Sequence, residues 1–211
     1  LMGKPLTIFD GSAVITGILL AFNLPVGVPW WIPVVGGVFG IAVGKMTFGG
    51  LGYNPVNPAI LGHIFLLISW PIPMTTWHKP NGFEGLDAET VATPLAILKD
   101  NSKIIMNRDS STIEAFNTAT SKLAELSDSY MDLFIGRIPG CIGETSVLLL
   151  LIGAAFLMYK QHIGWRIPFS FVATVGLFTW IFGGVDGYFT GPWLFHILSG
   201  GLIIGAFFMA T

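Results

Sequence analysis

The sequence predicts an all-α integral membrane protein, and three observations support this fold class. Of the 211 residues, 53% are hydrophobic and 10% are charged, whereas a soluble domain carries about 25% charged residues. The mean hydropathy is +0.73. The 27 glycines and 7 tryptophans are typical of closely packed membrane helices with aromatic side chains at the lipid–water interface.

Six apolar stretches give the expected transmembrane helices, about six in number, some of them short or broken. They cover residues 11–24, 31–48, 58–70, 145–159, 167–182 and 193–210. A helix needs about 20 apolar residues to cross a membrane, so the first and third stretches are short. Short helices interrupted by glycine or proline are tolerated at membrane depth where they pack inside a bundle or line a site. We therefore expect a bound group near them, within a larger helical bundle.

The chain divides into three predicted parts. Residues 1–70 hold the first membrane helices with a turn rich in glycine and asparagine, residues 71–143 form an external segment, and residues 144–211 hold the second group of membrane helices. The external segment is too long for a plain connector and is expected to contain two helices. One begins at Pro94; the other begins near Ser111, where Glu114 completes a capping box. Its apolar positions favour packing on a partner or on the membrane surface, with a covering lid as the simpler interpretation.

The positions of the positive charges predict the orientation. Four basic residues flank the short connections, and with six crossings they all fall on one face: Lys4, Lys45, Lys160 and Arg166. The positive-inside rule makes that face cytoplasmic, so the external segment lies on the outer face of a bacterial inner (cell) membrane that the chain crosses several times. Because the chain begins at Leu1 and ends in an apolar stretch, we also expect it to be a portion of a longer protein.

Charge and cysteine content exclude several function classes. A net charge of −2, without any cluster of Lys and Arg, argues against a nucleic-acid partner. The single cysteine, Cys141, excludes an internal disulfide framework and an iron–sulfur cluster held by this chain alone. No metal site and no catalytic residue of the chain's own are expected.

The most specific short motif is DAETVATP at residues 87–94. Thr93 before Pro94 predicts a helix N-cap followed by proline at the first helical position. The N-terminus of a helix also binds phosphate well, because free N–H groups and the helix dipole point at it. From these residues alone, an ordinary helix start is the simpler interpretation.

The same motif resembles the flavinylation motif Asp-x-x-(Ser/Thr)-x-Ala-Thr of the Rnf and sodium-pumping NADH:quinone oxidoreductase families, in which the last threonine is joined to FMN by a phosphoester bond. Further segments are similar to the D subunit of the Rnf complex and to its close relative, the B subunit of the quinone-linked enzyme. They are GKP at 3–5, DGSAVITG at 10–17, FGGLGYNPVNPA at 48–59 and IPGCIGETS at 138–146. The resemblance extends nearly from end to end.

The resemblance implies a set of cofactor-binding residues. Thr93 would carry covalent FMN, and the flavin transferase would read Asp87, Thr90 and Ala92. A second, non-covalent flavin, riboflavin, would lie near residues of the first part of the chain: Asn54, Asn57, Gly49, Gly50, Gly52 and Thr16. The glycines would allow the backbone to approach it closely. The sequence departs from the family pattern at Val91, Val56 and His63; at His63 the family often has arginine, so the contact loses a permanent positive charge.

The resemblance also implies a function. The chain would be a flavin-carrying membrane subunit of a redox-driven ion pump, an oxidoreductase that passes electrons through FMN and a second flavin between ferredoxin and NAD. Its partners would be other subunits of the complex, including a second FMN-carrying subunit and iron–sulfur subunits, together with the flavin transferase and membrane lipid. Two alternatives stay open: a B-type subunit of the sodium-pumping NADH:quinone oxidoreductase, and a channel or secondary transporter, which has no need of the Thr93 motif.

Other polar residues at the membrane helices have simpler interpretations. His63 and His196 would hydrogen-bond across helices, although ionisable groups at membrane depth are functional candidates. Cys141 would be a small packing residue. Three acids precede apolar stretches and would cap helices, with a role in an ion path as the alternative: Asp10, Glu144 and Asp186.

Overall fold

The structure, a computed structural model, describes residues 10–50, 52–78, 92–106, 117–122, 130–136, 138–143, 146–184 and 187–210. These described residues form helices and no strand, which confirms the all-α class. The chain separates into two compact units, Leu1–Thr76 and Trp77–Thr211. Within the described ranges, no helix is both long enough and apolar enough to cross a membrane. The number of membrane spans stays a prediction.

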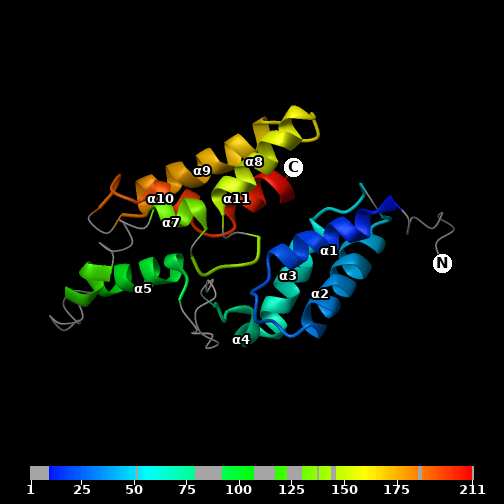
Figure 1. The fold of residues 1–211 in the computed structure, drawn as a ribbon, viewed down its shortest axis with the longest axis horizontal. Coiled ribbons are helices and arrows are strands. Elements are labelled where there is room, and N and C mark those ends of the chain that lie inside the picture. The colour runs from blue at the N-terminus through cyan, green and yellow to red at the C-terminus, as the bar shows by residue number, and fades with distance from the viewer. Residues whose placement is uncertain are drawn as a thin grey trace. The chain divides into compact units, whose positions relative to one another are not determined.

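The first unit is a bundle of three helices, α1 (Ser12–Phe22), α2 (Trp31–Ile41) and α3 (Pro58–Ser69), followed by the short helix α4 (Pro71–Met74). Figure 1 shows α1, α2 and α3 side by side. The helix α2 continues without interruption into a π-helical turn, η2 (Ala42–Met46). The helices α1, α2 with η2, and α3 lie within the first three predicted apolar stretches, and each packs against the other two.

Glycine allows α2 and α3 to pack with their backbones in contact. A Cβ atom added to Gly40 would lie 2.4 Å from the carbonyl oxygen of Pro58, and one added to Gly62 would lie 2.6 Å from the carbonyl oxygen of Gly36. Both distances are far shorter than any real contact of a Cβ atom. Small residues at a helix interface let backbones approach in this way, and the contact at Pro58 fixes where α3 begins relative to α2.

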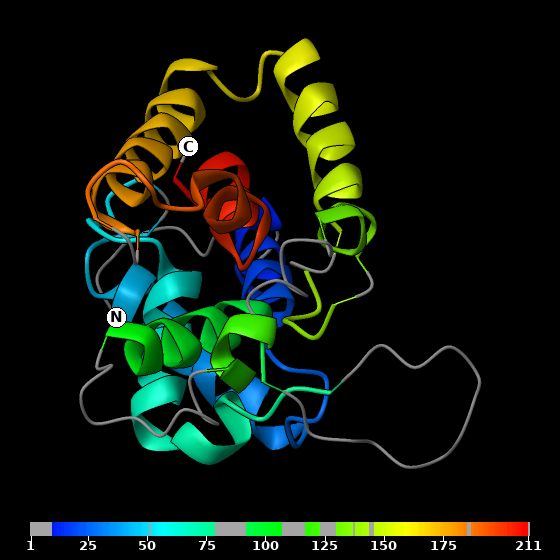
Figure 2. The same cartoon turned by 90° about the vertical axis from the view of Figure 1, so that its left-hand side faces the viewer.

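The second unit contains α5 (Pro94–Met106), α7 (Tyr130–Ile135), α8 (Val147–Tyr159), α9 (Arg166–Phe182), α10 (Trp193–Leu198), α11 (Leu202–Ile204) and the π turn η3 (Gly205–Met209). Residues 117–122 are also helical. In Figure 2 the last helical pieces, drawn in red, lie between α8 and α9, and α11 contacts α8 while η3 contacts α9. One buried cluster of this unit consists of Leu133, Ile138 and Phe195, with Leu98, Tyr130 and Leu198 packed against it.

Two sequence predictions for this unit have mixed outcomes. The stretch 193–210 is not one helix, because Ser199 is extended, with ψ 141°, and Gly200 has φ +74°. The predicted helix near Ser111 falls mostly outside the described residues. The apolar positions at helical spacing that predict this helix are Ile113, Phe116, Leu123, Leu126, Tyr130 and Leu133. Tyr130 and Leu133 lie in α7, where Leu133 is completely buried.

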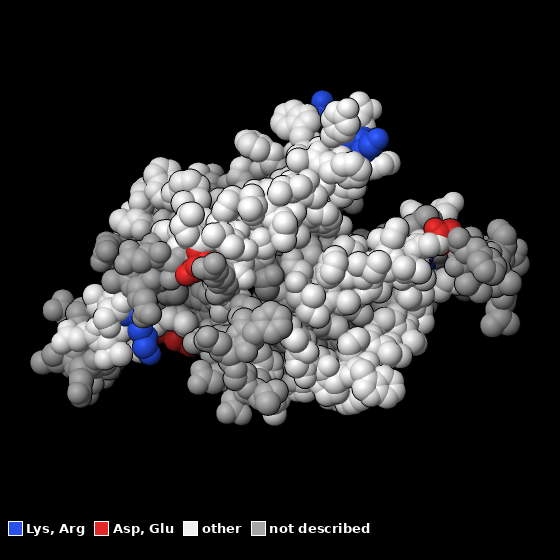
Figure 3. Space-filling view, in the orientation of Figure 1, with Lys and Arg blue, Asp and Glu red and all other residues white. Residues whose placement is uncertain are grey.

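The outer faces of the helices are strongly apolar. Large hydrophobic side chains such as Val14, Ile68, Leu149 and Phe169 are each more than 60% exposed. In the space-filling view most of the described surface carries neither acidic nor basic side chains (Figure 3). Apolar surface on this scale marks contact with a membrane or with another protein.

Candidate functional site

Thr93 lies at the N-terminus of α5, as the sequence predicts. Its Oγ1 accepts a hydrogen bond from the backbone N–H of Ala96 at 3.3 Å, and its carbonyl oxygen accepts one from Ile97 at 3.0 Å. This is the bonding of an N-cap residue, and Pro94 occupies the first helical position. Thr93 is half-buried, whereas Ala92 is exposed. The hydroxyl is thus held at a fixed place beside an accessible piece of backbone.

The helix α5 anchors this position to the second unit. Leu98 packs against the buried cluster of Leu133, Ile138 and Phe195, and Pro94 is buried. Asn101 is 8% exposed and donates from Nδ2 to the carbonyl oxygen of Ile97 at 2.7 Å. Thr93 therefore stands at the end of a packed helix. Asp87 and Thr90, the other two predicted motif residues, lie outside the described residues.

The first unit brings the predicted glycine and asparagine residues into one turn between η2 and α3. Gly49, Gly50 and Gly52 have φ of 110°, 99° and 84°, a backbone conformation that side chains with a Cβ atom rarely adopt. A Cβ atom added to Gly50 or Gly52 would meet nothing within 4 Å. The turn is therefore shaped by glycine and leaves open space beside its backbone.

The two asparagines have different local roles. Asn57 is the N-cap of α3, and its Oδ1 accepts from the N–H of Ala59 at 2.9 Å. Asn54 donates from Nδ2 to the carbonyl oxygen of Val56 at 3.0 Å, which leaves its Oδ1 available as an acceptor. Both side chains are half-buried.

Thr16 is buried in α1, where its hydroxyl donates to the carbonyl oxygen of Ser12 at 2.9 Å. A hydroxyl that donates in this way keeps its oxygen lone pairs as acceptors. Thr16 therefore presents at most an acceptor to a neighbouring group.

A buried polar chain lies in the same unit, and the sequence did not reveal it. Lys45 is 5% exposed, and its Nζ donates to Ser12 Oγ. Ser12 in turn donates to Oδ1 of Asp10 from its hydroxyl and from its backbone N–H at 2.8 Å. The sequence places Lys45 at the end of the second apolar stretch, and the structure agrees; what the sequence does not predict is that its side chain is buried.

Asp10 is not the N-cap of α1, because that position is Gly11; its carboxylate instead accepts the two hydrogen bonds from Ser12, the first residue of the helix. The two hydrogen bonds from Ser12, with a smaller contribution from the charge of Lys45, lower the pKa of the Asp10 carboxyl below its ordinary value. Asp10 itself is exposed. Glu144 and Asp186, for which capping is also predicted, lie outside the described residues.

For the other single residues that the sequence analysis named, the structure shows fewer polar contacts. The buried Nδ1 atom of His63 has no hydrogen-bond partner among the described residues, so the interpretation of a bond across helices finds no support at this atom. His196 packs edge-on against Phe195. Cys141 is buried, in agreement with a packing role. Within the described parts of the chain, no three His, Cys, Asp or Glu side chains come together as a metal site.

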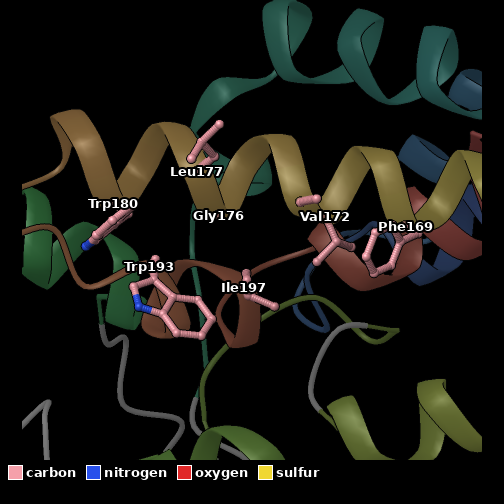
Figure 4. A pocket seen from close by; sticks show the side chains of 8 residues that line it. Phe169, Val172, Gly176, Leu177, Trp180, Trp193 and Ile197 are labelled. Atoms are coloured by element: carbon pink, nitrogen blue, oxygen red, sulfur yellow. The ribbon is translucent and has the colours of Figure 1, made fainter. Parts of the chain in front are cut away.

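A groove of about 470 Å³ lies between α9 and α10. Figure 4 shows Trp180, Trp193 and Ile197 along it, with Gly176 on α9 facing Ile197. All of its lining residues are apolar or aromatic, so it offers no charged group that could hold a phosphate. The groove suits a hydrocarbon surface and does not match the predicted flavin sites.

The comparisons with known proteins give a consistent result. A family model described as the NQR2, RnfD, RnfE family matches residues 1–211. The chain is similar to the D subunit of the proton-translocating ferredoxin:NAD(+) oxidoreductase complex of Clostridium ljungdahlii, with 46% identity over 99% of this chain and 59% of the relative. It is similar to the D subunit of the Na(+)-translocating counterpart from Acetobacterium woodii, with 45% identity over 100% of this chain and 57% of the relative.

A third relative belongs to the quinone-linked branch. The chain is 35% identical to the B subunit of the Na(+)-translocating NADH-quinone reductase of Yersinia pestis, over 93% of this chain and 45% of the relative. In each comparison the chain spans less than two thirds of the length of the relative.

Proposed function

The chain belongs to the NQR2, RnfD, RnfE family, and from this premise we propose that it is the flavin-carrying membrane part of a redox-driven ion pump of the Rnf type. Electrons would pass between ferredoxin and NAD through covalent FMN on Thr93 and a second flavin in the first unit. The higher identity to the two ferredoxin-linked relatives than to the quinone-linked one supports this branch. The proposal covers either coupling ion, sodium or proton.

The observation that carries the proposal is the place of the Thr93 hydroxyl. It lies at the start of a helix of 13 residues, at the end of the flavinylation-like motif. In the first turn Pro94 has no N–H group, the N–H of Leu95 points towards the start of the helix, and the N–H of Ala96 donates to the Thr93 Oγ1 that would carry the phosphate. A phosphoester at Thr93 Oγ1 would place its negative charge where the helix dipole favours it. The donor set thus fits the phosphate of FMN.

In this proposal the flavins supply the redox chemistry, and the chain supplies binding and position. Thr93 would hold FMN by its ester oxygen, and α5 would keep that oxygen in place through Leu98 and Pro94. Thr90 and Asp87 would serve recognition by the flavin transferase. The open space beside Gly50 and Gly52 and the Oδ1 acceptor of Asn54 fit a second flavin, riboflavin, with a planar ring that needs both close backbone approach and polar partners.

The location and the partners follow from the same proposal. The chain would cross the bacterial inner membrane several times, with residues 71–143 on the outer face and residues 1–70 and 144–211 holding the membrane helices. The other subunits would include a second FMN-carrying subunit and iron–sulfur subunits that handle ferredoxin and NAD. The apolar outer faces of the helices support contact with lipid and with these subunits.

Intact-mass analysis of the chain from the purified complex tests the covalent assignment. We expect a mass increase equal to FMN less one water, and fragmentation should assign it to the peptide that contains Thr93. The denatured chain should also show yellow fluorescence on a gel. An unmodified Thr93 in an active complex would contradict the assignment.

Asn57 gives a test that separates helix capping from flavin binding. Asn57→Ala removes the cap of α3, which costs about 1 kcal/mol, and removes the amide, so both thermal stability and non-covalent flavin should fall. Asn57→Ser keeps a good cap but not the amide; we expect nearly normal stability and loss of non-covalent flavin. The measurements are thermal unfolding of the complex and the flavin released on denaturation. Normal flavin content in the serine variant would restrict Asn57 to capping.

The quinone-linked alternative rests on the similarity to the relative from Yersinia pestis. The two branches differ in the reaction of the complete complex, so the purified complex should reduce NAD⁺ with reduced ferredoxin under the proposal. Reduction of quinone by NADH would favour the alternative. A colourless chain with an unmodified Thr93 peptide would favour the channel or transporter class instead.

A further inference from the structure

The first unit buries a positively charged side chain at the end of the helix formed by α2 and η2. Lys45 is 5% exposed and lies in the π turn η2. Removing an ammonium group from water is costly unless it is hydrogen-bonded or paired. Because burying the ammonium group of Lys45 is costly, we expect a function in which its positive charge takes part.

One acceptor for the ammonium group of Lys45 lies among the described residues. An ammonium group has three N–H donors, and among the described residues the acceptor recorded for Lys45 Nζ is Ser12 Oγ. The hydroxyl of Ser12 in turn donates a hydrogen bond to the carboxylate of Asp10. Because Asp10 is exposed, water and salt screen its charge more than they screen that of Lys45. The buried end of this chain of hydrogen bonds is therefore the positively charged one, and the exposed end is the negatively charged one.

The backbone connects Lys45 to both groups of residues predicted for the second flavin. Its carbonyl oxygen accepts the N–H of Gly50 at 3.0 Å, which closes the glycine turn. Its side chain reaches Ser12, whose carbonyl oxygen accepts the hydroxyl of Thr16. Lys45 thus joins the start of α1, which carries Thr16, to the glycine turn.

We propose that Lys45 is a positioning residue of the second flavin site, where its buried ammonium group favours the reduced flavin electrostatically and Ser12 and Asp10 hold it in place. This inference rests on the proposed function. A flavin ring that receives two electrons from the preceding carrier and takes up one proton bears one negative charge, which a nearby cation stabilises relative to the neutral oxidised ring. Lys45 therefore raises the midpoint potential of this flavin, and Ser12 contributes by fixing the ammonium group.

The experiment uses the full complex in a Thr93→Ala background, so that the second flavin is the one carried by this chain. Lys45→Met removes the charge at similar side-chain length, and Lys45→Arg keeps it. Ser12→Ala removes the anchoring hydroxyl. Lys160→Met is the matched control, because Lys160 is exposed at the end of α8. The readouts are the non-covalent flavin released on denaturation and its midpoint potential in a spectroscopic redox titration.

We expect a lower midpoint potential in Lys45→Met, a smaller downward shift in Ser12→Ala, and unchanged values in Lys45→Arg and Lys160→Met. Loss of non-covalent flavin from an assembled Lys45→Met complex, with retention in Lys45→Arg, also supports the role. Unchanged potential and content in Lys45→Met overturn it; if that variant does not assemble, an unchanged potential in Ser12→Ala overturns it. Absence of non-covalent flavin from the unmutated complex would instead refute the second flavin of the proposed function.

Discussion

Thr93→Ala is expected to abolish covalent FMN on this chain and to leave the second unit folded. The phosphoester needs the Thr93 oxygen, and alanine has none, so the loss should be complete. The structural cost is small, because the variant loses one cap, worth about 1 kcal/mol, while Leu98 still packs against Leu133, Ile138 and Phe195. Intact mass reports the flavin, and thermal unfolding reports the fold. Electron transfer between ferredoxin and NAD should fall with the flavin.

Ser146→Ala is the matched control for the lost cap. Ser146 is the N-cap of α8, and its Oγ accepts a hydrogen bond from the N–H of Leu149 at 3.4 Å. This is the same type of capping bond that Thr93 makes, but Ser146 does not follow a flavinylation-like motif. Both variants should lose similar stability, and only Thr93→Ala should lose FMN. Covalent FMN that persists in Thr93→Ala would refute the attachment site. Equal loss of FMN in Ser146→Ala would indicate that the flavin depends on the fold of the unit in general.

Gly40→Ala is expected to destabilise the first unit by about 3 kcal/mol, the upper part of the range for overpacking. The new methyl group would lie 2.4 Å from the carbonyl oxygen of Pro58, and a backbone atom cannot move aside as a side chain can. The start of α3 would have to shift, and Asn57 would move with it. We therefore expect both a lower unfolding temperature and loss of non-covalent flavin, while FMN on Thr93 stays in place.

Gly37→Ala separates this contact from the general effect of alanine in a helix. Its Cβ atom would lie 4.0 Å from Leu20, an ordinary contact, and alanine favours a helix by up to about 1 kcal/mol over glycine. This variant should be at least as stable as the unmutated protein. If Gly40→Ala behaves in the same way, the close approach of α2 and α3 does not limit the stability of the unit.

Local signals explain the parts of the fold that could be predicted from the sequence. Asn57–Pro58 and Thr93–Pro94 each combine a cap with a proline, and each starts a helix where expected. These signals work because the hydrogen bonds involved, such as Ala59 to Asn57 and Ala96 to Thr93, span two or three residues. The order of residues along the chain is therefore enough to recognise these helix starts.

Contacts between distant residues explain what the sequence could not predict. Lys45 and Ser12 are 33 positions apart, and only the packing of α1 against α2 brings them together. The break in the last apolar stretch depends on Ser199 and Gly200, yet glycine and serine also occur inside intact helices such as α9. Composition therefore predicts the helical class, and tertiary contacts decide which polar groups meet.

The π turn η2 has a consequence for helical phase. A regular α-helix advances about 100° per residue, so Lys45, nine positions after Gly36, would lie about half a turn away from Gly36 and from α3, against which Gly36 packs. In the π turn the hydrogen bonds join residues i and i+5, so each residue advances by a smaller angle about the helix axis. The direction of the Lys45 side chain therefore differs from the one that a regular helix would give. The inward direction of this charge therefore depends on the number of residues in the turn as much as on the lysine.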